Sequence, residues 1–298
     1  FKALVDQGIV KYAVSGDGGL TRLDHFFNHA FGVTSTLMQD GAGKWVYSFA
    51  TPYEKDKLAF YAQLFAEGLI DPEYLTLKWS DVAQKFYAGD IALVAVTQGG
   101  VVDSYSRKIV INQGEQAEAV VLPPAKGVAQ SYISTSVAKE TRGWSINADS
   151  KVKEAAVAVM DFMASPAGRT IDKLGIEGVH YTVENGKAII TDQFSDWWSK
   201  FWETFNNLDE SFVDKNTLMT PQAWKSMDMA KEYYTEDVDV VLPAEYLPTY
   251  DAIRQLYTQY ATEIILGQRP VDDFDEFIST YYGYGGDQLA EYLATVLN

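Results

Sequence analysis

The sequence predicts an α/β fold, because short apolar runs bounded by turns alternate with longer stretches in which apolar residues recur at helical spacing. The clearest run is residues 91–96, which follows a Gly-Asp turn and has the composition of a buried strand. The clearest helix is residues 51–67, which places Leu58 and Tyr61 on one face. With 47% apolar residues in a chain of 298, we expect a sizeable core and two domains.

Three strands are predicted to share one sheet: residues 10–15, 91–96 and 119–122. The helix over residues 51–67 and a second helix over residues 151–163 should pack against this sheet. The alternation of strands and helices predicts that both faces of the sheet are covered.

Local signals mark where these elements begin and turn. Thr51 and Glu54 match a capping box, in which each side chain binds a free backbone N–H of the first helical turn. Pro52 stands at the first helical position, where its missing N–H does no harm. Further along, the pair Asn185-Gly186 predicts a tight hairpin between two strands.

The helix over residues 151–163 has an apolar face, formed by Val152, Ala156, Val159 and Met163 at helical spacing. We expect this face to be buried. We also expect most phenylalanines in the core, in particular Phe26, Phe60, Phe86 and Phe162.

Charge and composition exclude several classes of protein. The formal net charge is −17 and the pI is near 4.5, which argues against nucleic acid or an anionic membrane surface as a partner. The sequence has no cysteine, which excludes disulfides, thiol catalysis and thiolate metal sites. No apolar run approaches the ~20 residues that span a bilayer.

The candidate metal ligands His25 and His29 stand four residues apart on one predicted helix. The metalloprotease motif places Glu directly after the first His, and here Phe26 occupies that position. No third ligand cluster accompanies the pair, so we predict no metal and no cofactor. A phosphate loop, a dinucleotide fingerprint and a nucleophile elbow are also missing from the sequence.

An enzyme remains an alternative at this point. The 41 acidic residues supply many pairs that could lie close enough for glycoside hydrolysis. A Ser-His-Asp arrangement also stays open, although no motif marks it.

Aromatic residues make up 14% of the chain, with 19 Tyr and 7 Trp. Several stand at strand ends or beside Pro and Gly, where an amphipathic ring can face a cleft. The apolar face of a sugar stacks well on such a ring while its hydroxyls bind polar groups at the rim. The residues in such places are Trp45, Trp144, Tyr246 and Tyr250.

The order of several segments resembles a known family. The segments are "FYAQLFAEGLIDPEY", "FYAGDIALVAV", "AVVLPPAKG", "GWSINADSKVKEAAVAVMDFMASPAGR" and "LGIEGVHYTVENGK". Together they are similar to extracellular solute-binding proteins of ABC importers, in the family-1 carbohydrate-binding group. Within that group, the chain is most similar to the large lipoprotein-type oligosaccharide binders of Gram-positive bacteria.

The resemblance implies a periplasmic-binding-protein-like (type II) clamshell of two lobes, with the first lobe incomplete in this chain. Residues 1–175 would form most of the second lobe, 176–243 would return to the first, and 244–298 would pack back on the second. A strand over residues 143–146 would run to the ligand cleft. Some relatives carry a calcium loop before the strand that matches residues 10–15; the single Asp there predicts none here.

The implied function is capture of an oligosaccharide outside the membrane by hinge closure, without covalent chemistry, and its delivery to the permease. The protein would be a monomer that reaches the membrane only through a lipid anchor outside this chain. We expect it to be extracellular, as a cell-surface lipoprotein or in the periplasm. The alternatives are a carbohydrate-active enzyme and a surface adhesion or scaffold module.

By position in the family, several loops would face the ligand. Asp17, Gln98 and Glu177 would exchange hydrogen bonds with sugar hydroxyls, and Trp144 and Tyr250 would stack on sugar rings. Arg142 would bind a carboxylate if the sugar is a uronate. The loop residues 17–19, 98–100 and 177–180 also include Gly18, Gly19, Gly99, Gly100 and His180.

Overall fold

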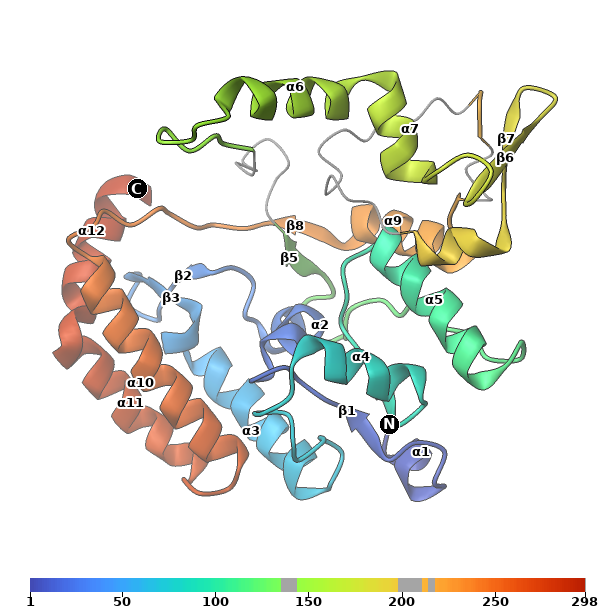
Figure 1. Cartoon of the computed structure of the whole chain (residues 1–298). Coiled ribbons are helices and arrows are strands. Elements are labelled where there is room, and N and C mark those ends of the chain that lie inside the picture. Colours follow the sequence, from blue (N-terminus) through green and yellow to red (C-terminus); the bar gives the residue numbers. More distant parts are fainter. Residues whose placement is uncertain (135–143, 198–210, 214–217, 298) are drawn as a thin grey trace. The chain divides into compact units, whose positions relative to one another are not determined.

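The computed structural model of the chain describes residues 1–134, 144–197, 211–213 and 218–297 (Figure 1). The chain divides into two compact units. The first unit comprises residues 1–96, 109–138 and 228–298, and the second comprises residues 97–108 and 139–227. These divisions fall at other residues than the predicted lobe boundaries, which remain predictions.

The first unit contains a small parallel sheet. Strand β1 (Tyr12–Val14) pairs in parallel with β4 (Ile91–Leu93), with Tyr12 opposite Ile91 and Val14 opposite Leu93. A parallel bridge joins Val14 to Ile70 on the other side of β1. This confirms that the first two predicted strands lie together, and it brings the carboxyl ends of three chain segments to one edge.

The predicted third strand is wrong: residues 119–122 have no strand structure, and Val120 and Leu122 are exposed. The chain there leads into a segment that follows the end of α2 (Thr21–Phe31). Ala125 N donates to Phe26 O and Val128 N donates to Ala30 O. The two prolines that follow Leu122 supply no backbone donor for a strand ladder.

Helix α3 (Pro52–Ala66) matches the clearest predicted helix, and Pro52 takes its first position as expected. The predicted capping box is wrong. The hydroxyl of Thr51 donates to Ser48 O at 2.6 Å, and Glu54 turns into the protein interior. The 3-10 turn η1 (Ser48–Ala50) supplies this nearer acceptor for Thr51.

The core of the first unit joins the sheet to α3 and to the C-terminal helices. Leu58 and Tyr61 of α3 share one buried cluster with Val14 of β1 and with Ile253 and Phe277 from the C-terminal helices. The other elements assigned wholly to this unit are α1 (Lys2–Asp6), β2 (Leu37–Gln39), β3 (Trp45–Tyr47), α4 (Trp79–Tyr87), β5 (Tyr132–Ser134), β8 (Tyr234–Glu236), α10 (Leu247–Ile265), η4 (Val271–Asp273), α11 (Phe274–Tyr281), η5 (Tyr282–Gly286) and α12 (Asp287–Leu297).

The second unit contains the predicted hairpin. Strands β6 (Tyr181–Glu184) and β7 (Lys187–Ile190) pair antiparallel across Asn185 and Gly186, whose φ angles are 52° and 76°. Positive φ at both positions is the geometry that an Asn-Gly turn supplies. This unit also holds α6 (Lys153–Ala164), α7 (Pro166–Leu174) and η3 (Asp192–Asp196). Two further helices, α5 (Gly100–Gln113) and α9 (Pro221–Tyr233), begin in it.

The structure contradicts three expectations for helix α6. It belongs to the second unit, whereas we expected it beside the β1–β4 sheet. The predicted buried face is only partly buried: Met163 is buried, but Val152 and Val159 are exposed. Phe162, expected in the core, is 45% exposed, whereas Phe26 and Phe60 pack on the core of the first unit. Upstream of the helix, residues 144–146 show no strand.

Candidate functional site

The shared edge of the parallel segments is the natural place to look for a binding site, because ligands of open α/β sheets bind outside the carboxyl ends of the strands. After β1 the chain enters the Gly-rich turn that carries Asp17, and after Ile70 it reaches Asp71. Both acidic residues therefore lie at this edge of the first unit.

Asp17 is held by a basic and an aromatic partner. Both of its carboxylate oxygens lie 3.0 Å from the Nε of Arg22, in the first turn of α2. The guanidinium carbon of Arg22 lies 3.9 Å from the ring centroid of Trp79, the first residue of α4. The Asp17 side chain is 18% exposed and that of Arg22 is 42% exposed, so both can meet a ligand from solvent.

The glycines around Asp17 explain the shape of the turn. A Cβ on Gly16 would lie 1.8 Å from Gly19 O, so the backbone there approaches too closely for any side chain. Gly18 has a φ of 81°, and its N–H donates to Tyr74 O at 2.9 Å. The turn is thereby fixed to the segment after Ile70, and Asp17 is presented at the edge.

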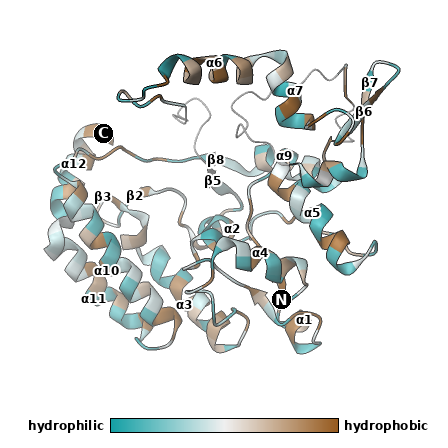
Figure 2. Cartoon of the chain, viewed as in Figure 1, coloured by the Kyte–Doolittle hydropathy of each residue, from teal (hydrophilic) through white to brown (hydrophobic). Residues whose placement is uncertain are grey.

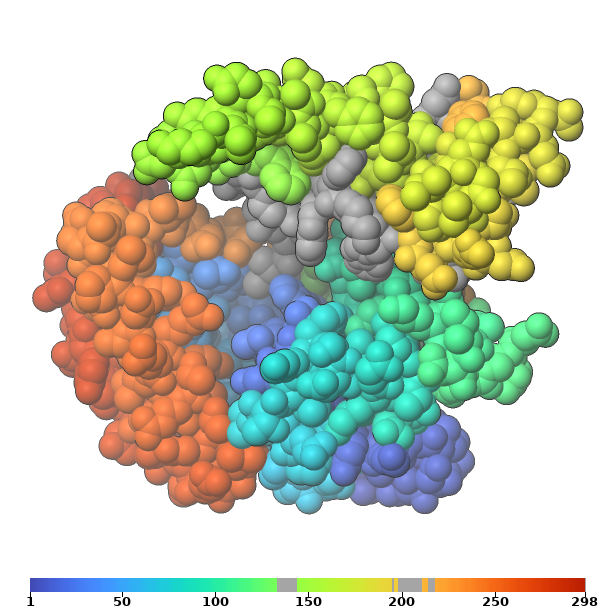
Figure 3. Space-filling view, in the orientation of Figure 1, coloured from blue at the N-terminus to red at the C-terminus, as the bar shows by residue number. Residues whose placement is uncertain are grey.

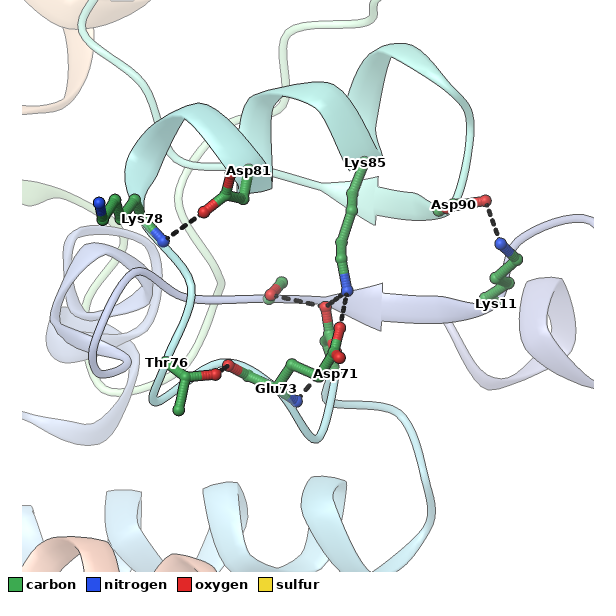
Figure 4. A network of polar contacts seen from close by, with 9 residues as sticks. Lys11, Asp71, Glu73, Thr76, Lys78, Asp81, Lys85 and Asp90 are labelled. Atoms are coloured by element: carbon green, nitrogen blue, oxygen red, sulfur yellow. Dashed lines mark hydrogen bonds and ion pairs between the residues drawn. The ribbon is translucent and has the colours of Figure 1, made fainter.

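A buried network supports this edge (Figure 4). The Asp71 carboxylate is fully buried and accepts from Ser15 Oγ at 3.1 Å and from Lys85 Nζ at 2.7 Å. Lys85 also binds Glu73 at 2.7 Å. Partial burial by itself lowers the pKa of Lys85, but its hydrogen bonds to Asp71 and Glu73 outweigh burial and raise it. Because Ser15 directly precedes the Gly-rich turn, this charged network anchors the turn.

The first turn of α4 is fixed in a similar way. The Asp81 carboxylate accepts from Lys78 N at 2.9 Å, which satisfies a free donor at the start of the helix (Figure 4).

The sequence reasoning found Asp17 but missed Arg22 and Trp79. Nothing in the local spacing marks these two residues, because they come from separate elements.

Tyr250, also predicted at the site, lies on α10 and is half-buried. Its ring centroid is 4.6 Å from that of Tyr47, within the aromatic part of the first unit's core. Its structural partners therefore differ from those of Asp17, and its stacking on a sugar remains a prediction.

The other predicted residues belong to the second unit, at three places along the chain. Gln98 is exposed just before α5, and the N–H of Gly99 donates to Ser226 Oγ at 3.0 Å. Gly99 has a φ of 71°, and a Cβ there would meet the Met227 side chain of α9 at 3.5 Å, an ordinary van der Waals distance. Gly100 is the first residue of α5.

The turn with Glu177 and His180 forms the second place. Glu177 is exposed, whereas His180 is half-buried and its Nδ1 accepts from Ile176 N at 2.9 Å. The His180 ring lies 4.9 Å from the ring of Trp197, whose Nε1 donates to Asp172 O at 2.8 Å. His180 thus shapes the turn, and Glu177 is the residue of this pair that points to solvent.

Trp144 marks the third place and is 49% exposed, in a segment without strand or helix ahead of α6. Arg142 lies outside the described residues. The ligand-binding roles of all these residues remain predictions.

The two candidate metal ligands have different surroundings. His25 is exposed, whereas His29 is buried and its Nδ1 lies 2.5 Å from Ser131 Oγ. Burial lowers the pKa of His29. Within the described residues, no group of three or more His, Cys, Asp and Glu side chains is arranged to hold a metal ion.

The family assignment comes from a match to a family model. The model of the bacterial extracellular solute-binding proteins matches residues 1–170, more than half of the chain. The chain belongs to this family. No curated protein matches this chain. Across the part of the chain that the structure describes, no helix is both long and apolar enough to cross a membrane.

Solved structures show the same fold. The alginate-binding protein AlgQ2, crystallised without calcium, has a TM-score of 0.68 at 19% identity, over 97% of this chain and 65% of its own. The S. pneumoniae ABC-transporter substrate-binding protein FusA, an EF-hand mutant in complex with fructo-nystose, has a TM-score of 0.61 at 19% identity, over 97% and 62%. The S. pneumoniae N-glycan transport solute-binding protein NgtS, in complex with Man1GlcNAc, has a TM-score of 0.57 at 15% identity, over 97% and 64%. This chain therefore spans less than two thirds of the length of each of them.

Proposed function

We propose that this chain is the larger part of the solute-binding component of an ABC importer, which captures an oligosaccharide outside the membrane and delivers it to the permease. Family membership and the fold shared with three carbohydrate-binding transport proteins support this proposal. The protein would be monomeric and extracellular, held at the membrane by a lipid anchor. Binding would proceed by hinge closure, as the family resemblance implies, and without bond cleavage.

The observation that carries the proposal is the arrangement of Asp17, Arg22 and Trp79 at the edge of the parallel segments. A carboxylate accepts hydrogen bonds from sugar hydroxyls, and a guanidinium donates to them in a planar fork. An indole ring offers a flat apolar surface to a sugar ring. Since Asp17 and Trp79 both contact Arg22, the three groups are held in place before a ligand arrives, which lowers the entropy lost on binding.

The test is a titration of the intact protein with a panel of neutral and acidic oligosaccharides, followed by calorimetry and thermal shift. A few sugars should bind, and Trp79→Ala should weaken their affinity by about 5- to 150-fold, the value of an aromatic contact of ~1–3 kcal/mol. Tyr284→Ala serves as the control, because Tyr284 is an aromatic residue of the same unit that is 55% exposed.

Three outcomes would contradict the proposal. Binding of no sugar in the panel would favour an adhesion or scaffold module. Recovery of shortened oligosaccharides after incubation would favour a carbohydrate-active enzyme. Unchanged affinity in Trp79→Ala would show that the ligand does not bind at this edge of the first unit.

A further inference from the structure

A row of apolar side chains on α6 faces solvent. Val152, Val159 and Phe162 are 62%, 57% and 45% exposed, and Ala155 is exposed as well. Val152 is the residue directly before the first helical residue, and the four residues recur at i, i+3, i+7 and i+10, so they form one stripe along the helix and its start. We call these four residues the α6 stripe. Figure 2 shows apolar residues along α6, and in Figure 3 this helix forms part of the surface.

The opposite side of α6 is different. Glu154 and Asp161 lie there with Val157, which is two residues from Val159 and therefore about 200° around the helix. Next to the stripe, Met163 is buried. The helix is thus amphipathic, but only one margin of its apolar side is covered by the residues that the structure describes.

The described part of the second unit has a small core. In its described part, the buried apolar cluster consists of Leu174, Tyr181, Ala188 and Val213, whereas the cluster of the first unit draws on β1, α2, α3 and all three C-terminal helices. Other large apolar side chains of the second unit are exposed too, including Ile176 at 54%. Folded domains hide such faces against another layer of structure, so something is expected to cover the stripe.

Chain length indicates what covers it. The matches to AlgQ2 and FusA each include 97% of this chain but only 65% and 62% of the length of those two proteins. A protein of their length carries about half as much sequence again. We propose that in the intact solute-binding protein the α6 stripe packs against a segment of the same polypeptide that lies outside these 298 residues.

A second copy of the chain fits the stripe less well. Helix α6 has 12 residues and is therefore about 18 Å long. One stripe of that length offers far less than the roughly 800 Å² per partner that a stable interface between separate proteins buries. A segment of the same polypeptide loses much less translational freedom on docking, so a small apolar contact is enough.

The proposal can be tested by thiol labelling of the intact protein. These 298 residues contain no cysteine, so Val159→Cys and Val157→Cys each introduce one known thiol into this region. Val159 and Val157 are 57% and 47% exposed on the same helix, so the same substitution is compared at two positions of similar exposure. We expect a maleimide, quantified by peptide mapping, to label Val159→Cys roughly tenfold or more slowly than Val157→Cys. Equal rates would overturn the proposal.

Photo-crosslinking identifies the segment that covers the stripe. A benzoylphenylalanine is placed at position 159, and at position 157 in the control. Crosslinks from position 159 to peptides outside these 298 residues support the proposal. Crosslinks to peptides within them, crosslinks between two copies, or no excess over the control overturn it. None of these readouts involves a sugar, so failure here is distinct from failure of the proposed function.

Discussion

The Nζ of Lys57 lies 3.0 Å from Oε2 of Glu54, and both side chains are almost fully buried in the first unit. The same Nζ lies 2.8 Å from Asp24 and 2.7 Å from Asn28, both on α2. Glu54 in turn accepts from the hydroxyl of Tyr257 on α10 at 2.5 Å. Lys57 therefore joins α3 to α2, and its partner Glu54 joins α3 to α10.

Replacing this ammonium group should be costly. Burial by itself lowers the pKa of Lys57, but Asp24 and Glu54 outweigh burial and raise it, so the side chain is charged. Lys57→Met would leave Glu54 buried without its partner charge. We expect the free energy of unfolding to fall by about 3–5 kcal/mol, measured by chemical denaturation.

Lys55→Met is the matched control, two residues away on the same helix. Lys55 contacts Asp272 and Asp275, whose side chains are 94% and 75% exposed. Ion pairs in solvent contribute less than about 1 kcal/mol, so this variant should be nearly as stable as the wild type. Similar losses in the two variants would show that burial does not make the Lys57 network special.

His29 should make stability depend on pH. The residue is 2% exposed, and burial lowers its pKa from the ordinary value of 6.5. Because the folded pKa is the lower one, the unfolded chain binds the proton first on acidification. The contribution of His29 is therefore present above about pH 6.5 and is lost as the pH falls through its folded pKa. The loss should reach up to about 1.4 kcal/mol for each pH unit in that window.

Unfolding at about pH 7.5 and about pH 5 measures this effect. His29→Gln should flatten the dependence, since Gln has no proton to bind in this range. His25→Gln is the control, because it makes the same substitution at an exposed position of the same helix, and it should keep the wild-type slope. A His29→Gln slope equal to that of the wild type would contradict the prediction.

The sequence predicted those elements whose signals are local. The Asn185-Gly186 turn, Pro52 at a helix start and the apolar run at β4 each depend on a few neighbouring residues, and the structure confirms them. The predictions that failed depended on distant partners. Thr51 and Glu54 fit a capping box. In the structure, however, the Thr51 hydroxyl donates to Ser48 O, and the Glu54 carboxylate pairs with the buried Lys57.

The candidate site shows the same division. Asp17 could be found because it stands in a Gly-rich turn after a strand, and the close approach of Gly16 to Gly19 shows why that turn needs glycine. Arg22 and Trp79 could not be found, because only the folded chain brings the start of α4 to the guanidinium group. The exposure of Phe162 could not be foreseen either, since its sequence pattern is that of a buried face.

Trp144 should contribute to ligand affinity and little to folding. Its side chain is 49% exposed, in a segment without regular structure. Truncating a core Trp costs ~3–5 kcal/mol of stability, and Trp144→Ala should cost far less. If the ring stacks on a sugar, affinity should fall roughly 5- to 150-fold. Melting and titration of the intact variant separate these effects; a large drop in melting temperature with unchanged affinity would place Trp144 in the core.

In the turn between α7 and β6, a side chain should destabilise the protein more at one glycine than at another. Gly175 has φ 81° and ψ −143°, a region that is essentially restricted to glycine. A Cβ there would lie 2.5 Å from Nδ1 of His180, the atom that accepts from Ile176 N. Gly175→Ala should therefore break that hydrogen bond and lower the free energy of unfolding by about 2–4 kcal/mol.

Gly178→Ala tests the same substitution three residues along the turn. Gly178 also has a positive φ, 79°, but a Cβ there would meet nothing within 4 Å. Only the backbone penalty of about 1–2 kcal/mol applies, so this variant should unfold at distinctly higher denaturant than Gly175→Ala. The two variants should also differ at His180: its ring signals, followed by NMR, should shift in Gly175→Ala and stay in place in Gly178→Ala. Equal stability together with unshifted His180 signals in both variants would show that His180 does not shape the turn. His180 could then not be what fixes the position of Glu177.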